Sequence, residues 1–257
     1  MKNVIISQLY ELRKNRTVFL FCFGVLILCI AICWMVTGWT ETSKISETVA
    51  DNGLQVISMF VRTSILIITG CICAGDFPDK TINHEITSGT LRKDAFFGRA
   101  VLAIVLSEII AIVTILLCLA IMSALYGWGD TVTLDSALKR VFLLVFPYFK
   151  YSCFAVMISF IVKQPYAAFL FVILATIVYT SVIRGSEIVV YLLSDVTAAK
   201  ICTYNSYATY GLETEVRMIY DQSIDTDLIA GAVIASLIIG ALYLIIGYHY
   251  YNKDDLN

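Results

Sequence analysis

Residues 99–126 read RAVLAIVLSEIIAIVTILLCLAIMSALY, and after the initial Arg99 this run holds a single charged residue, Glu108. A helix that crosses the hydrocarbon core of a bilayer needs about 20 predominantly apolar residues. The run exceeds that length and predicts a transmembrane helix. The whole chain agrees, because 59% of its 257 residues are hydrophobic and 15% are charged. Soluble domains carry about 25% charged residues, so we expect an all-α integral membrane protein.

Five more apolar windows surround this run. They cover residues 17–38, 54–76, 139–162, 165–184 and 228–251. Together the six windows predict six transmembrane helices in a single permease-like domain that occupies residues 1–257. The glycines of the last window, Gly231, Gly240 and Gly247, are expected to let neighbouring helices approach closely.

The polar segment before the first window predicts a further helix over residues 2–15. Its apolar residues Ile5, Leu9 and Leu12 recur at helical spacing, with charged residues between them. A helix of this kind can lie in the membrane interface and contact lipid. We therefore expect an amphipathic interfacial helix at the N-terminus.

The distribution of lysine and arginine sets the expected orientation. These residues favour the cytoplasmic ends of spans. With the N-terminus inside, ten of them flank inner ends and six flank outer ends. The prediction is a multi-pass protein with both termini in the cytoplasm, which makes residues 75–98 a cytoplasmic loop.

That loop contains the polar stretch GDFPDKTINHEITSGTLRKD, residues 75–94. Asp76, Pro78 and Asp79 suit the start of a helix, where carboxylates accept free N–H groups and proline is tolerated. Ser88–Gly89 suits its end, because glycine readily adopts the left-handed conformation. The stretch therefore predicts a short helix held between two spans.

This short helix is expected to dock into a groove of another protein. Ile82 and Ile86 share one face, so the helix would offer apolar as well as polar groups to the cytosol, and Thr90 would cap the next helix. The predicted partner-binding residues are Asp79, Lys80, Thr81, Ile82, Asn83, His84, Glu85, Ile86, Thr87, Ser88 and Gly89.

The stretch DFPDKTINHEITSGTLRKDAFFGRAV resembles the cytoplasmic loop of permease subunits of bacterial type-2 ATP-binding cassette (ABC) exporters. The resemblance is carried by Asp76–Phe77, Lys80–Thr81–Ile82, Ser88–Gly89, Arg92–Lys93 and Arg99. The predicted six spans and the N-terminal amphipathic helix extend it over nearly the whole chain. It implies that the short helix is a coupling helix docked on a separate nucleotide-binding ATPase subunit, and that a second permease copy, identical or related, completes the translocation path.

The expected energy source lies outside this chain. The sequence has no G-x-x-x-x-G-K-[ST] loop to cradle phosphates. The chain is therefore expected to be neither an enzyme nor a cofactor-binding protein, and the resemblance implies that ATP and magnesium bind the partner subunit. A net charge of −2 without a basic face argues against nucleic acid as a partner.

The cargo is inferred from the apolar interior, which suits amphipathic molecules. Similar permeases act in peptide-toxin export or antimicrobial-peptide immunity, so a peptide substrate is expected. The resemblance also implies short outer helices in residues 184–227. The tyrosines of that segment suit a membrane interface.

Three charges fall inside predicted spans: Arg62, Glu108 and Lys150. A charge at the bilayer centre costs at least about 2.5–3.5 kcal/mol, so it normally has a partner or a wet cavity. We expect Glu108 to pair with Arg62 or Lys150. The pair would either lock spans together or leave one cation facing a polar cavity for substrate.

Two other classes of function stay open. An ATP-independent carrier or channel would also be an apolar multi-pass chain. An intramembrane enzyme would need facing carboxylates or a Ser/His pair within the spans, and this chain has one intramembrane carboxylate. Seven of the eight cysteines lie in or beside apolar runs, where thiols pack as small apolar groups, and no metal site is expected.

Overall fold

The computed structural model of the chain describes residues 2–14, 54–78, 81–128, 134–175, 177–178 and 226–253, with a few single positions between 20 and 31. Every regular element in these ranges is a helix, which confirms the all-α class for them. The labelled helices are α1 (Lys2–Lys14), α4 (Leu54–Ala74), α5 (Thr81–Thr87), α6 (Arg92–Tyr126), α7 (Leu134–Leu143), α8 (Val145–Val162) and α11 (Thr226–Lys253). Most of the predicted first span and outer segment lies outside the described residues.

Three helical segments are long and apolar enough to cross a membrane: Arg92–Leu125, Val141–Val162 and Val233–Lys253. Two shorter apolar helices, Phe60–Ala74 and Pro165–Ala175, fall within the predicted second and fifth windows. The described residues therefore have the character of a membrane protein. The count of six spans stays a prediction.

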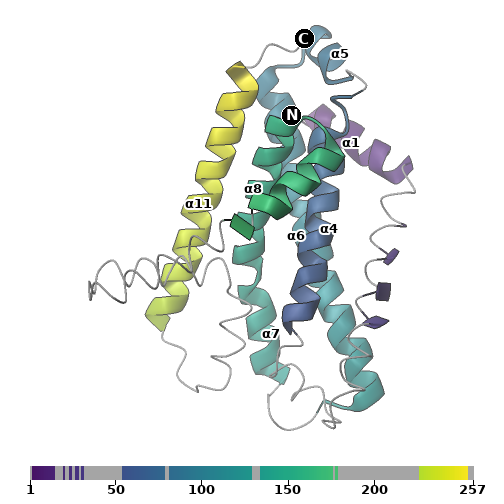
Figure 1. Cartoon of the computed structure of the whole chain (residues 1–257), viewed down its shortest axis with the longest axis vertical. Helices are drawn as coiled ribbons and strands as arrows, with labels where there is room; N and C mark the ends of the chain where they lie inside the picture. The colour runs from purple at the N-terminus through teal and green to yellow at the C-terminus, as the bar shows by residue number, and fades with distance from the viewer. Residues whose placement is uncertain are drawn as a thin grey trace.

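The long helices α4, α6, α8 and α11 lie side by side in a bundle (Figure 1). α11 packs along α8 through two glycines. A Cβ atom built on Gly240 would lie 2.8 Å from Cε1 of Phe149, and one built on Gly247 would lie 3.2 Å from Cα of Met157. These two glycines therefore pack helices closely, as predicted. Gly240 faces Phe149, and Gly247, later in α11, faces Met157, later in α8, so the two helices run in the same direction. Alternate helices of an up-and-down bundle have this parallel arrangement.

The predicted fourth span, residues 139–162, is not one continuous helix. α7 ends at Leu143 and α8 begins at Val145. Proline has no N–H to donate, and its ring clashes with the carbonyl of the residue four positions earlier. In this chain Pro147 stands four residues after Leu143, so the break falls where the proline requires it.

One end of the bundle collects segments that are far apart in the sequence. α1, α5 and the C-terminal end of α11 all lie there (Figure 1). Phe77 meets Phe160 and Tyr251 edge-on, with ring centroids 6.1 and 6.4 Å apart. Buried residues of α1, α5 and α6 join the same apolar cluster. This end corresponds to the side predicted to face the cytoplasm.

Candidate functional site

α5 ends at Ser88–Gly89, as the sequence predicts. Gly89 has φ of 104°, a conformation that glycine adopts without a steric penalty. Its N–H donates to the carbonyl of Ile86 at 3.0 Å, and the N–H of Thr90 donates to the carbonyl of Glu85 at 3.3 Å. This pair of bonds is the Schellman arrangement that satisfies the last carbonyls of a helix.

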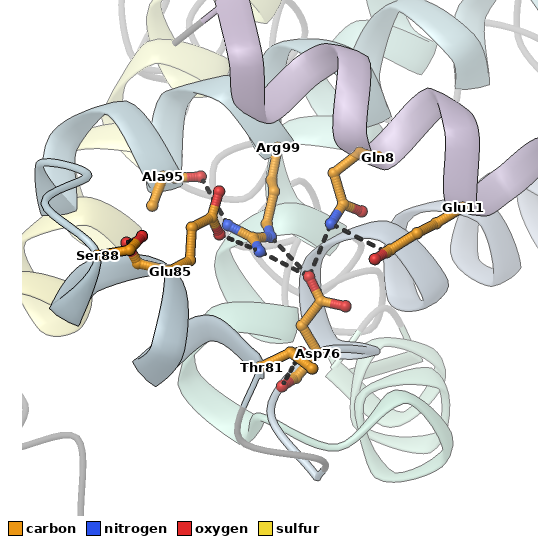
Figure 2. A network of polar contacts seen from close by, with 8 residues as sticks. All are labelled: Gln8, Glu11, Asp76, Thr81, Glu85, Ser88, Ala95 and Arg99. Carbon is orange, nitrogen blue, oxygen red and sulfur yellow. Dashed lines mark hydrogen bonds and ion pairs between the residues drawn. The ribbon is translucent and has the colours of Figure 1, made fainter.

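The start of α5 differs from the prediction. The N–H and the hydroxyl of Thr81 both donate to the backbone carbonyl of Asp76, at 3.2 and 3.0 Å. The Asp76 carboxylate does not cap this helix and instead faces Arg99 (Figure 2). Two of the predicted partner-binding residues, Asp79 and Lys80, lie outside the described residues.

The predicted cap at Thr90 is wrong. The N-cap residue of α6 is Leu91, and no side chain caps the helix there. The N–H groups of Asp94 and Ala95 donate to the carbonyl of Leu91 at 2.9 and 3.0 Å. Because Thr90 already closes α5, Leu91 is the residue left to precede α6.

The two faces of α5 also differ from the prediction. Ile82 is 1% exposed, and Ile86 packs against the buried cluster at this end of the bundle. The isoleucines are four residues apart on one helix face, and burying apolar area is favourable, so both turn inward. The helix therefore buries Ile82 and half-buries Ile86. Its exposed residues, here called the outer face of α5, are Thr81, His84, Thr87 and Ser88, followed by exposed Gly89, whereas Asn83 is half-buried.

Arg99 is the centre of a polar network beneath α5 (Figure 2). Its Nη2 atom lies 2.6 Å from Oδ2 of Asp76 and 2.6 Å from Oε2 of Glu85. Its Nε atom donates to the same Asp76 oxygen at 3.1 Å, and its side chain is 3% exposed. Charge-assisted hydrogen bonds of this kind are about twice as strong as neutral ones. They fasten α5 and the corner after α4 to the first turns of α6.

Gln8 extends the network to α1. Its Nε2 group donates to Oδ2 of Asp76 at 2.7 Å and, more weakly, to Oε2 of Glu11 at 3.4 Å. The pKa of Glu11 is raised above its usual value by burial and by the nearby charges of Asp76 and Glu85, and Arg99 opposes this shift. Four segments of the chain therefore meet around one arginine.

α1 is a helix over nearly the predicted range. Of the three apolar residues in the predicted pattern, Leu12 is buried and Ile5 packs against the buried cluster, but Leu9 is exposed. Val4, Gln8 and Leu12 are buried at spacings of four residues, whereas Leu9 is 45% exposed. The buried glutamine explains the difference, because its hydrogen bonds orient the helix. Polarity patterns alone favour Leu9 over Gln8 for the buried side.

The three predicted intramembrane charges are not brought together as an ion pair. Ser152 donates to Oε1 of Glu108 at 3.3 Å, while Oε2 is buried without a hydrogen-bond partner. In the described part of the chain, no salt bridge joins Glu108 to Arg62 or Lys150, so the predicted pair is wrong there. Residues two positions apart on a helix point about 200° away from each other. α8 turns Ser152 toward Glu108, and Lys150 is buried on another side.

The described residues contain no candidate metal-binding cluster. No group of three or more His, Cys, Asp or Glu residues there is arranged to hold a metal ion. Cys73, Cys118 and Cys153 are buried, and Cys71 is half-buried. They pack as apolar groups, in line with the sequence interpretation.

Comparison with known proteins found no matching family model and no curated protein of significant sequence similarity. α5 is a short helix with one exposed face. It is bonded to α6 through Glu85 and Arg99 and to the corner after α4 through Thr81 and Asp76, and Gln8 of α1 bonds Asp76.

Proposed function

We propose that this chain is the permease subunit of an ATP-driven exporter in the bacterial cytoplasmic membrane. α5 would be its coupling helix, docked on a separate ATPase subunit that binds ATP and magnesium. The observation that supports this proposal most is the chain of contacts from Glu85 through Arg99 to Asp76 and Gln8. A loop that only connected two spans would have no need of a buried arginine under its helix.

The contacts divide α5 into a docking side and a transmitting side. The outer face of α5 is free to meet a soluble partner, and it carries hydroxyl groups and one imidazole. On the opposite side Glu85 is bonded to Arg99 of α6, and Ile82 is buried in the cluster that also contains Phe160 and Tyr251. Movement of the ATPase would in this way displace α6, α8 and α11 together.

The proposed cargo is an amphipathic peptide, either a toxin or an antimicrobial peptide. The path would form between this chain and a second permease, identical or related. Large apolar side chains cover the exposed sides of α6 and α11, including Val105, Ile109, Ile238 and Leu242. Such surfaces suit contact with lipid tails or with another apolar helix.

The test is to co-express the full chain with candidate ATPase subunits and to measure co-purification and ATP hydrolysis in lipid nanodiscs. His84→Glu and Thr87→Arg change the outer face of α5 only. Both are expected to lose the ATPase subunit while the permease stays folded. Glu85→Gln leaves that face intact, so it should retain the ATPase subunit but weaken the stimulation of its activity by the permease.

Two outcomes would count against the proposal. Failure of every ATPase subunit to co-purify with the wild-type chain would remove the exporter interpretation. Co-purification that survives both outer-face changes would show that α5 is not the docking element. An ATP-independent carrier is the second candidate, favoured by the unpaired Glu108 in α6, and it would move substrate in vesicles that contain the permease alone.

A further inference from the structure

Hydroxyl groups of the long helices that have a hydrogen-bond partner are satisfied in two different ways, whereas those of Ser107 and Ser236 have none among the described residues. Ser64, Thr69 and Ser159 each donate to a carbonyl four residues earlier in their own helix, at 3.1, 2.8 and 2.8 Å. This local bond is common for serine and threonine in helices. Ser152 instead donates across to Glu108 on α6. The Ser152 hydroxyl therefore donates to the carboxyl group of Glu108 and not to a backbone carbonyl of its own helix.

Glu108 lies at the middle of the candidate span Arg92–Leu125. Ser152 supplies its one hydrogen bond, and the second carboxyl oxygen is buried with no hydrogen-bond partner. A buried polar atom without a partner is rare and costs about 1–3 kcal/mol, more when it is charged. Within the part of the chain that the structure describes, this carboxyl group therefore lacks a partner for its second oxygen, and the missing partner should be a donor or a cation.

Glu108 reaches the outer surface of α6, although its Oε2 atom is covered, so a ligand would have to displace the side chains over that atom. Glu108 itself is only partly buried. Val101 and Val105, seven and three residues earlier, are 41% and 51% exposed. Residues at these spacings lie on the same helix face. The Glu108 side chain thus lies next to an apolar surface that is exposed in the described part of the chain.

We propose that Glu108 and Ser152 form an intramembrane binding site for the positively charged group of an amphipathic ligand. Oε2 of Glu108 would contact the cationic group, Ser152 would hold Oε1, and Val101 and Val105 would contact the apolar body of the ligand. One carboxylate and one hydroxyl supply few of the six or more oxygens that a calcium or magnesium ion takes, and an apolar surface does not hold the waters that would supply the rest. An organic cation with its own apolar surface fits both the charge and the surroundings.

This inference goes beyond the proposed function, because it assigns a charge to the ligand and requires no ATPase subunit. The test uses the full-length protein in nanodiscs of zwitterionic lipid, with two probes of nearly equal size and opposite charge. These probes are tetraphenylphosphonium and tetraphenylborate, and binding is measured by equilibrium dialysis against empty nanodiscs. Glu108→Gln keeps the shape of the side chain and removes its charge.

Glu108→Gln is expected to weaken tetraphenylphosphonium binding about tenfold to a hundredfold, the range for loss of a hydrogen bond or contact to a charged group. Binding of tetraphenylborate should stay unchanged. Ser152→Ala should weaken binding of the cation by about threefold to tenfold. Ser159→Ala removes a hydroxyl from the same helix that bonds to its own backbone, so it should have no effect.

The proposal is overturned if Glu108→Gln binds the cation as tightly as the wild type does. It is also overturned if the substitution weakens both probes equally, because the effect would then be independent of charge. No ATPase subunit is present in this assay. Failure here therefore leaves the coupling proposal standing, and failure of co-purification leaves the cation site standing.

Discussion

The carboxylates of this chain occupy two contrasting environments. At the end of the bundle near α5, Asp76 and Glu85 share the buried guanidinium of Arg99. In the middle of α6, Glu108 receives one hydroxyl bond from Ser152 and has an oxygen with no partner. The first group is complete within the chain, whereas the second is not.

This difference distinguishes carboxylates that stabilise the fold from a carboxylate that is available to bind a ligand. Removing one member of a complete buried network leaves an uncompensated charge and strongly destabilises a protein. Removing the charge of Glu108, which has no ion-pair partner among the described residues, leaves no other charge without a partner. The two regions should therefore respond to neutral substitutions with opposite signs, and this contrast can be measured.

The largest effect is expected for Arg99→Met. The change leaves Asp76 and Glu85 facing each other with no cation between them. The free energy of unfolding should fall by about 3–5 kcal/mol, the range for breaking a buried charge pair. Unfolding in detergent, followed by circular dichroism, would measure it.

A matched variant sharpens this prediction. Adding Asp76→Asn and Glu85→Gln to Arg99→Met removes the repulsion as well, so part of the lost stability should return. A loss below about 1 kcal/mol for Arg99→Met alone would mean that the network is no stronger than an exposed surface ion pair.

A smaller effect should distinguish the two carboxylates of the network. Oδ2 of Asp76 accepts two bonds from Arg99 and one from Gln8, whereas Oε2 of Glu85 accepts one bond from Arg99. Asp76→Asn should therefore cost about 2 kcal/mol and Glu85→Gln about 1 kcal/mol in the same unfolding assay. Equal losses, or the reverse order, would contradict the asymmetry of the contacts.

Glu108→Gln should act in the other direction. A neutral amide is less costly in an apolar interior than an unpaired carboxylate. Stability is expected to stay unchanged or to rise by about 1 kcal/mol, whereas Glu85→Gln, the same chemical change, lowers it. A clear loss of stability for Glu108→Gln would show that the carboxylate has a stabilising partner in the folded protein.

The smallest effect concerns Glu11. Because the folded protein raises the pKa of this carboxyl group, folding favours its protonated form. Its contribution to stability is fully present below the pKa of the unfolded chain and is lost as the pH rises through the raised pKa. The gain in melting temperature on lowering the pH from 8 to 5 should therefore be smaller in Glu11→Gln than in the wild type. An identical pH profile would exclude Glu11 as a contributor.

Prediction from the sequence succeeded best for features that depend on neighbouring residues. The helical class follows from apolar runs of membrane length, and α1 follows from its periodic polarity. The end of α5 follows from Ser88–Gly89, because only a glycine accepts that backbone conformation easily.

The sequence by itself therefore determined which segments are helices and where several of them end, since hydropathy and local backbone preferences act over a few residues. Only the tertiary structure decided which way each helix is turned. That rotation buried Ile82, half-buried Ile86, placed Gln8 and not Leu9 on the buried side of α1, and gave Glu108 a serine where a cation was expected. The side-chain partners of Arg99 come from two other segments of the chain, and Gln8 of a third segment joins them through Asp76. Their meeting depends on how four helices pack, and no local pattern records that packing.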